Sequence, residues 1–287
     1  MIEVAISNIL NINVEAIKDL KRFERGMSNY TYYFKVGSNE YTYRKIGMDA
    51  ELFVNYEKEF KHLKLASNAG ITSEIVYFNA ETGEKIQKYL KGQTLDFKDI
   101  DIFGANLIKT LKKLHSLKSS DISDYQLLKR LDTYESYLNE KALDDNYFKL
   151  KNYFIKTYNE HFINNPKVFC HNDIQNINAI FTKTSVHLID FEFAGLNDIY
   201  YDFATFEENA DLIYEMYYNK SISSLDSSKI AFYKLYQQLQ WYLVATHKDN
   251  IGFSKLTNYD FKALANYFIN KALSIYKEIS EVNFNDN

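Results

Sequence analysis

The sequence is poor in several residue types, and each shortage excludes a class of protein. Cys170 is the only cysteine among the 287 residues, so an internal disulfide and a zinc site built on several thiolates are both excluded. We therefore expect a reducing, cytoplasmic compartment. Basic residues are not in excess, because 34 Lys and Arg stand against 38 Asp and Glu, for a net charge of -4. Since nucleic-acid binding needs a cationic surface, we expect no nucleic-acid partner.

Long apolar runs are also missing. No stretch reaches the roughly 20 residues that a membrane helix requires, so we predict no membrane span. The first ten residues have no basic segment ahead of their apolar residues and include Glu3, which argues against a secretory signal. The remaining composition, 46% hydrophobic and 25% charged residues, is that of an ordinary globular protein. The length allows one large domain or two lobes.

The first third of the chain predicts a small sheet with one main helix. The strand-like runs are rich in aromatic and β-branched residues and form two pairs, each separated by a turn with a glycine. Residues 51–69 have apolar side chains at helical spacing and end at Gly70, a common helix terminator. The predicted strands are residues 30–36, 41–46, 75–80 and 85–90.

From about residue 97 the pattern changes to helices. The clearest predicted helices are residues 102–117 and 134–158, and Lys91–Gln93 looks like a connector. We therefore predict an α+β protein with a β-rich N-lobe over residues 1–90 and a mostly α-helical C-lobe over residues 91–287.

One polar motif stands out in the predicted C-lobe, on a predicted loop between helical sequence and an apolar strand. His171, Asp173 and Asn178 form the pattern His-x-Asp-x-x-x-x-Asn, and Asp190 follows twelve residues later at the end of the apolar run 185–190. Phosphoryl transfer requires such residues, because a carboxylate must meet the attacking hydroxyl and oxygen ligands must hold metal ions on the phosphates. An Asx-rich turn, with Asp173 and Asn178 as turn formers, is the structural alternative. The spacing of all four residues favours the functional interpretation.

These residues resemble the choline/ethanolamine kinase and aminoglycoside phosphotransferase superfamily, whose fold is similar to that of protein kinases. The run from Asp190 to Ala204 is most similar to that of bacterial LicA-type choline kinases. Four further segments resemble the family: the loop Arg25–Asn29, the strand Glu40–Arg44, the helix residue Glu59 and the helix 233–248. The resemblance implies a two-lobed, protein-kinase-like fold with a small antiparallel sheet in the N-lobe.

The resemblance also implies roles for single residues. Asp173 is the catalytic base, His171 orients its loop, and Gln175 lines the substrate end of that loop. Asn178 and Asp190 are the Mg²⁺ ligands. The implied ATP-binding residues are Gly26, Met27, Ser28, Asn29, Arg44, Glu59 and Tyr89, with Arg44 on the phosphates, Glu59 as its partner and Tyr89 in the hinge near adenine. Glu57 is an alternative partner for Arg44.

The implied substrate residues are Glu192, Phe193, Glu208 and Trp241, and the sequence departs from the family pattern beside two of them. Val244 replaces the second of two tryptophans that enclose a quaternary ammonium group by cation–π attraction. Asn209 stands where the family has a glutamate facing the cationic group. A third departure is Arg25, which replaces the first glycine of the nucleotide loop.

The resulting prediction is an ATP- and Mg²⁺-dependent phosphotransferase that acts on the hydroxyl of a small cationic alcohol, with choline first and ethanolamine next. Thiamine or an aminoglycoside is an alternative substrate. A nucleotide-binding pseudokinase with a regulatory role is an alternative from another class, although retention of Asp173, Asn178 and Asp190 argues against it. A helical scaffold without a ligand leaves the acidic motif unexplained. The expected state is a monomer or a homodimer.

Overall fold

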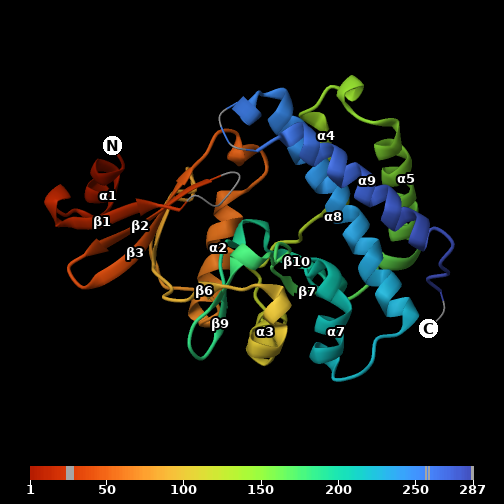
Figure 1. Ribbon diagram of the computed structural model, residues 1–287, viewed down its shortest axis with the longest axis horizontal. Coiled ribbons are helices and arrows are strands. Elements are labelled where there is room, and N and C mark those ends of the chain that lie inside the picture. Colours follow the sequence, from red (N-terminus) through yellow and green to blue (C-terminus); the bar gives the residue numbers. More distant parts are fainter. Residues whose placement is uncertain (24–28, 256, 258, 286–287) are drawn as a thin grey trace. The chain divides into compact units, whose positions relative to one another are not determined.

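The computed structural model describes residues 1–23, 29–255, 257 and 259–285 (Figure 1). The chain forms two compact units that alternate along the sequence. Unit 1 comprises Met1–Ser123 and Asp173–Gly195, and unit 2 comprises Asp124–Asn172 and Leu196–Asn287. In this division residues 91–123 and 173–195 group with the N-terminal residues, whereas the predicted lobes are residues 1–90 and 91–287.

Unit 1 is built on an antiparallel sheet of five strands in the order β1-β2-β3-β5-β4, and a second sheet has the order β6-β8-β9. Its strands are β1 (Ile17–Arg22), β2 (Asn29–Val36), β3 (Asn39–Ile46), β4 (Ile75–Phe78), β5 (Lys85–Lys88), β6 (Gln93–Thr94), β8 (Ala179–Phe181) and β9 (Val186–Leu188). Its helices are α1 (Ile2–Leu10), α2 (Tyr56–Asn68) and α3 (Ile100–Ser116), with short helical turns η1 (Val14–Ala16), η2 (Ala50–Leu52), η3 (Phe97–Asp99), η6 (Asn176–Asn178) and η7 (Phe191–Phe193).

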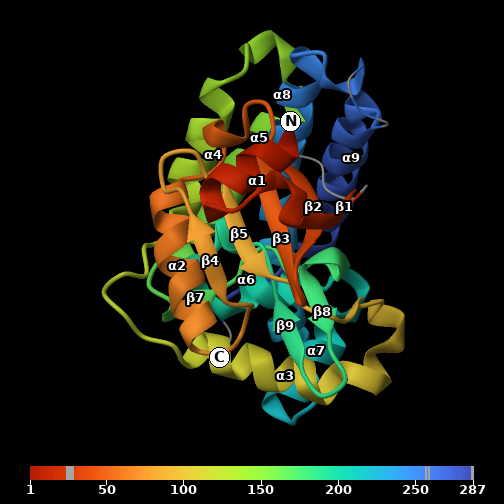
Figure 2. The same ribbon diagram turned by 90° about the vertical axis from the view of Figure 1, so that its left-hand side faces the viewer.

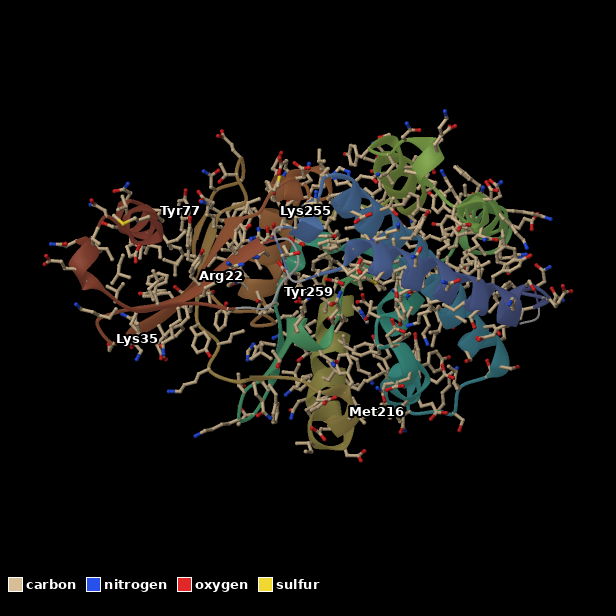
Figure 3. The ribbon with its side chains drawn as sticks, turned by 45° about the horizontal axis from the view of Figure 1, so that its top comes forward. Arg22, Lys35, Tyr77, Met216, Lys255 and Tyr259 are labelled. Carbon is tan, nitrogen blue, oxygen red and sulfur yellow. The ribbon has the colours of Figure 1, made fainter. Side chains whose placement is uncertain are left out.

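The predicted hairpin forms the centre of the five-stranded sheet. β2 and β3 pair in continuous register from Asn29↔Ile46 to Val36↔Asn39, and Gly37 takes the positive φ of 59° that the tight turn needs. Phe34 of β2 is fully buried with Tyr43 of β3. Figure 2 shows helix α2 beside β4. Arg22, labelled in Figure 3, lies on the edge strand β1. Its guanidinium is 4.6 Å from the ring centroid of Tyr30.

Hydrogen bonds from three separate segments hold residues 173–195 in unit 1. Leu95 N–H donates to the Ala179 carbonyl and Leu188 N–H donates to the Ile71 carbonyl, each at 3.0 Å. The Thr110 hydroxyl of α3 donates to the Val186 carbonyl at 2.8 Å. The second half of the polar motif therefore shares a folding unit with the predicted nucleotide-binding sheet.

Unit 2 is mainly helical. Its helices are α4 (Leu127–Ser136), α5 (Asp145–Thr157), α6 (Ile199–Ala204), α7 (Ala210–Tyr218), α8 (Ser224–Asn250) and α9 (Phe261–Ile279), with the shorter turns η4 (Glu140–Ala142), η5 (Tyr158–Phe162), η8 (Glu207–Asn209) and η9 (Phe253–Lys255). Strands β7 (Lys167–Cys170) and β10 (Gly195–Asp198) form a two-stranded sheet. Helices α8 and α9 lie side by side (Figure 1). Phe154, Phe162 and Phe232 stack in the core, with ring centroids 4.4–4.6 Å apart along the chain of contacts.

The predicted change from a β-rich to a helical sequence is confirmed, whereas three local predictions are wrong. The single helix over 134–158 is two helices, because the Asp144 side chain accepts the Asn146 N–H and starts α5 anew. The helix predicted from residue 51 begins at Tyr56, where Asn55 is the N-cap. The polar motif follows strand β7 rather than a helix. None of the described helices combines the length and the hydrophobicity that a membrane-spanning segment requires.

Candidate active site

The predicted catalytic carboxylate lies in a tight polar turn of unit 1. Gln175 donates its side-chain amide to Asp173 Oδ1 at 2.8 Å. Asn178 donates its amide to Asp173 Oδ2 at 3.0 Å and to the Asp173 carbonyl at the same distance. Both carboxylate oxygens are therefore fixed in direction by neutral amides. The side-chain nitrogen of Asn178 donates to Asp173, so the amide oxygen of Asn178 is the atom that can bind a cation.

Asp190 is joined to this turn through the backbone. The N–H of Ile189 donates to the Asn178 carbonyl at 2.9 Å, so the residue preceding Asp190 is hydrogen-bonded to the predicted metal-binding asparagine. Asp190 has a φ of 66°, which is rare for a residue other than glycine, and such conformations occur often at functional sites. Its side chain is 33% exposed, so a ligand can reach the carboxylate.

Arg44 of β3 connects Asp190 with helix α2. Its Nη2 lies 2.7 Å from Glu59 Oε2, and its Nη1 lies 3.1 Å from Asp190 Oδ1. Glu57 instead pairs with Lys61 on the exposed face of α2, at 2.8 Å. Of the two carboxylates that the sequence left open, the structure pairs Glu59 with Arg44. The helical repeat explains this choice, because Glu57 and Glu59 point to different sides of the helix.

The structure adds Lys85 of β5, which the sequence did not single out. Its Nζ lies 2.9 Å from Glu59 Oε1 and 3.5 Å from Asp190 Oδ1. Arg44 and Lys85 are nearly completely buried, and the side chain of Glu59 is fully buried between them. Strand pairing brings the two cations together, because Arg44 of β3 is the direct partner of Lys85 of β5. The sequence around Lys85, in a strand of four residues, has no local pattern that indicates its pairing with Arg44.

Glu192 completes the charged cluster. Its Oε2 accepts a hydrogen bond from Asn29 Nδ2 at 3.1 Å and lies 3.4 Å from Arg44 Nη1. Burial, together with the nearby charge of Asp190, raises the pKa of Glu192 to about 8. Burial by itself lowers the pKa of Arg44, but Glu59, Asp190 and Glu192 outweigh that effect and raise it. The resemblance implies that Glu192 binds the substrate. In the structure, Glu192 instead contacts Asn29 and Arg44, two residues predicted to bind the nucleotide.

Of the other residues predicted to bind the nucleotide, Asn29 and Tyr89 lie within the described part of the chain. Gly26, Met27 and Ser28, like Arg25, lie outside the described residues. Asn29 opens β2. Tyr89 follows β5, donates its backbone N–H to the Glu40 carbonyl at 3.0 Å and packs edge-on against Tyr33, with ring centroids 4.9 Å apart.

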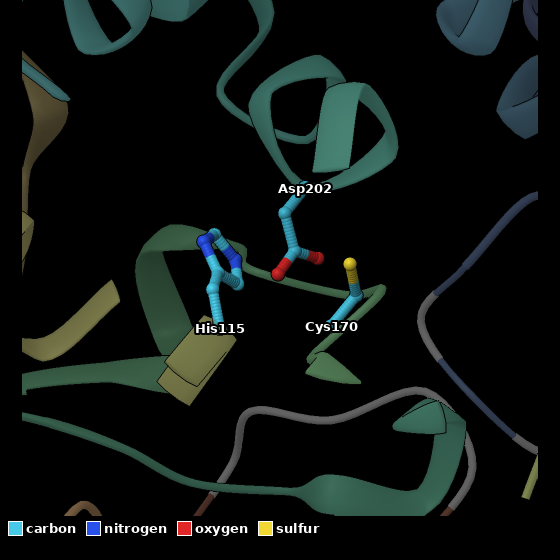
Figure 4. Close-up of side chains that lie close together, drawn as sticks. All are labelled: His115, Cys170 and Asp202. Atoms are coloured by element: carbon cyan, nitrogen blue, oxygen red, sulfur yellow. The ribbon is translucent and has the colours of Figure 1, made fainter. Parts of the chain in front are cut away.

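In unit 2 a buried aspartate holds the start of the polar motif. The Asp202 carboxylate of α6 accepts the backbone N–H of His171 at 2.9 Å and that of Asn172 at 2.7 Å. Figure 4 shows Asp202 with Cys170, the last residue of β7. Burial raises the pKa of the Cys170 thiol, which disfavours a reactive thiolate. Sequence reasoning gave Asp202 no role, although it lies in the run that carries the family resemblance.

The four predicted substrate residues fall into both units. Glu192 and Phe193 belong to η7 of unit 1, where Phe193 is buried. In unit 2, Glu208 is exposed on η8, and Trp241 is half-buried on α8. Glu207, beside Glu208, pairs with Lys271 of α9 at 2.5 Å. These four assignments remain predictions.

The donor atoms in unit 1 fit a hard cation bound to phosphate. Asn178 offers an amide oxygen and Asp190 a partly exposed carboxylate, and Mg²⁺ prefers such oxygen ligands. Arg44 and Lys85 add fixed positive charge beside Asp190, which suits an anionic ligand. The arrangement can therefore place a polyphosphate, a divalent cation and a proton-accepting carboxylate in one unit.

Comparison with known proteins agrees with this chemistry. The sequence model described as "Phosphotransferase enzyme family" matches residues 19–212. Protein LicA of Haemophilus influenzae is 24% identical over 249 residues, covering 79% of this chain and 73% of the relative. The solved choline kinase LicA from Streptococcus pneumoniae has a TM-score of 0.79 and 22% identity, covering 96% of this chain and 98% of that one. An aminoglycoside phosphotransferase solved with ADP and hygromycin B has a TM-score of 0.72 and 14% identity, with 98% and 99% covered. These similarities confirm the predicted fold class.

Proposed function

The chain belongs to the phosphotransferase enzyme family, and on that basis we propose that it transfers the γ-phosphoryl group of ATP to the hydroxyl of a small amino alcohol, with choline as the preferred substrate. The observation that carries the proposal is the Asp173 carboxylate, held by the amides of Gln175 and Asn178 at 2.8 and 3.0 Å. A carboxylate oriented in this way suits a base that meets a substrate hydroxyl.

Asp173 accepts the hydroxyl proton as the substrate oxygen attacks the γ-phosphorus. The bond from that phosphorus to the β–γ bridging oxygen breaks, so the products are the phosphorylated alcohol and ADP. Gln175 and Asn178 keep the carboxylate aimed during this step. His171 supports the loop from the other side of the motif through its backbone hydrogen bond to Asp202.

Asn178 and Asp190 are the proposed Mg²⁺ ligands. Bound Mg²⁺ neutralises charge that develops on the phosphate oxygens. Arg44 is anchored by Glu59 and keeps positive charge beside the phosphates. The loop Gly26–Asn29 and Tyr89 are proposed to hold the rest of the nucleotide.

The choice of choline is supported by the similarity to LicA of Haemophilus influenzae and to the solved choline kinase LicA. Trp241 on α8 offers a ring for cation–π attraction to the quaternary ammonium group, and Glu192, Phe193 and Glu208 are the other proposed substrate residues. Val244, which replaces the second tryptophan of the family pattern, is buried at 7% exposure. An aliphatic side chain cannot supply the second aromatic face, so we expect choline to bind more weakly than a two-tryptophan site allows.

The test is an ADP-release assay with ATP, Mg²⁺ and one of four alcohols: choline, ethanolamine, thiamine or an aminoglycoside. We expect the largest signal with choline. Asp173→Asn should lower turnover about 10²–10⁴-fold, the usual contribution of a positioned base, and leave ATP affinity nearly unchanged. Asn176→Ala is the matched control, because the Asn176 side chain is exposed on the same turn η6.

Three outcomes decide between the functions. A larger signal with another alcohol would replace choline and keep the phosphotransferase activity. ATP binding without ADP release from any alcohol would favour the pseudokinase. Equal rates for Asp173→Asn and the wild-type protein would show that Asp173 is not the base.

A further inference from the structure

The two buried cations of unit 1 differ in how many of their N–H groups are engaged. Arg44 Nη2 donates to Glu59 and to the Gly83 carbonyl at 2.7 and 2.8 Å. Arg44 Nη1 donates to Asp190 and Glu192 at 3.1 and 3.4 Å. The remaining donor, Nε, is buried without a partner among the described residues. Both terminal nitrogens of Arg44 are therefore engaged with protein oxygens.

Lys85 has donor capacity to spare. Its ammonium group carries three N–H bonds. One donates to Glu59 Oε1 at 2.9 Å, and a second faces Asp190 Oδ1 at the longer distance of 3.5 Å. Within the described part of the chain, no further acceptor is found for the third.

The position of Lys85 is also suitable for phosphate. Its Nζ and Arg44 Nη1 both face the same oxygen of Asp190, and Asp190 is the proposed metal ligand with a 33% exposed side chain. A phosphate that shares a metal ion with Asp190 lies next to that carboxylate. A lysine ammonium can turn toward such a phosphate as a point charge, while the planar fork of Arg44 is held in its orientation by four acceptors.

We propose that Lys85 is the cation that contacts the nucleotide phosphates directly, and that Arg44 acts as a positioning residue which holds Glu59, Asp190 and Glu192 together. This assignment rests on the proposed function, and it moves the phosphate contact away from Arg44, where the resemblance placed it. Glu59 then holds both cations, Arg44 with one carboxylate oxygen and Lys85 with the other.

Binding of ATP with Mg²⁺, of ATP without Mg²⁺ and of adenosine, each measured by calorimetry, tests the assignment. Lys85→Met should weaken ATP binding about tenfold or more, as the loss of a hydrogen bond to a charged group does, both with and without Mg²⁺. Adenosine, which has no phosphate, should bind as tightly to Lys85→Met as to the wild-type protein. Lys88→Met is the matched control, because Lys88 lies on the same strand and contacts Asn39 and Tyr41 instead. Its ATP affinity should not change.

A second pair of variants guards against a folding defect, since Lys85→Met leaves one oxygen of buried Glu59 without its cation. In Glu59→Gln that buried charge is absent, so the double variant Lys85→Met/Glu59→Gln is compared with Glu59→Gln alone, at a temperature where circular dichroism shows that both proteins are folded. The same loss of ATP affinity between these two is expected. If Lys85 can be removed in either background without loss of ATP affinity, the assignment is wrong. Failure of the wild-type protein to bind ATP at all would instead overturn the proposed function.

Discussion

The two units each contain a buried carboxylate, and the groups that hold these carboxylates differ. Glu59 of unit 1 is 1% exposed and lies between the cations of Arg44 and Lys85. Asp202 of unit 2 is fully buried and accepts the backbone N–H groups of His171 and Asn172. One carboxylate is therefore held by charged side chains, and the other by two consecutive peptide groups.

This difference separates an adjustable site from a fixed support. Charged side chains can exchange one partner for another when a ligand binds. In unit 1, Arg44 and Lys85 each contact both Glu59 and Asp190. Backbone N–H groups move only if the chain itself moves, so Asp202 fixes the path of the loop that starts at His171. Breaking either arrangement leaves a buried polar group without its partner, and the cost depends on the charge of that group.

The largest expected effect is on unit 1. Glu59→Gln should lower the free energy of unfolding by about 3–5 kcal/mol, because Arg44 and Lys85 both lose the buried carboxylate that lies between them. Urea denaturation at pH 7 measures this change. Glu57→Gln is the matched control two residues away, where the carboxylate is exposed and pairs only with Lys61. It should have no measurable effect, since exposed ion pairs contribute little. Equal losses for the two variants would contradict the contrast between the faces of α2.

A smaller loss is expected in unit 2. Asp202→Asn should lower the free energy of unfolding by about 2 kcal/mol, because the amide NH₂ group must face one of the two backbone N–H donors that Asp202 now accepts. Thermal unfolding followed by circular dichroism measures it, with Asp145→Asn on the exposed first turn of α5 as the control. If Asp202→Asn lowered the free energy of unfolding more than Glu59→Gln does, the expected larger effect of charged partners over neutral ones would be wrong.

The sequence predicted the parts of the fold that depend on local signals. The hairpin around Gly37 and a helix within residues 51–69 follow from turn residues and apolar spacing, and the structure contains both, although the helix begins only at Tyr56. The break between α4 and α5 was missed, because the segment 134–158 contains no glycine or proline, and the helices are separated by the short turn η4 and the capping by Asp144. Strand β7 was missed because its partner β10 begins 25 residues after β7 ends.

The same distinction applies to the candidate site. The spacing of Asp173, Asn178 and Asp190 pointed to one chemistry, and the structure brings these residues together through the turn η6 and the backbone of Ile189. Lys85 could not be found in this way, because its partnership with Arg44 depends on the pairing of β3 with β5. Asp202 could not be found in this way either, because its partners are backbone N–H groups, and these do not depend on the residue type.

The smallest predicted effect is a pH dependence of the charged cluster in unit 1. The pKa of Glu192 rises from 4.5 to about 8 because of burial and the nearby Asp190. The folded protein then binds a proton that the unfolded chain releases near pH 4.5, so this group makes the protein less stable as the pH rises from 4.5 toward 8. His62 acts in the opposite sense. Burial lowers its pKa from 6.5 to about 4, so its contribution to stability grows between pH 4 and 6.5.

Of these two effects, only that of Glu192 is expected above pH 6.5. The free energy of unfolding, measured by urea denaturation without divalent cations, should fall by about 1 kcal/mol between pH 6.5 and 8. Glu192→Gln should remove most of this slope, because the amide has no proton to lose in this range, and Glu208→Gln on the exposed turn η8 should preserve it. The same slope in Glu192→Gln as in the wild-type protein would place the titrating group elsewhere. Loss of the slope in Glu192→Gln alone would show that the adjustable cluster of unit 1 holds a proton near neutral pH, in the place where it is proposed to receive a metal-bound nucleotide.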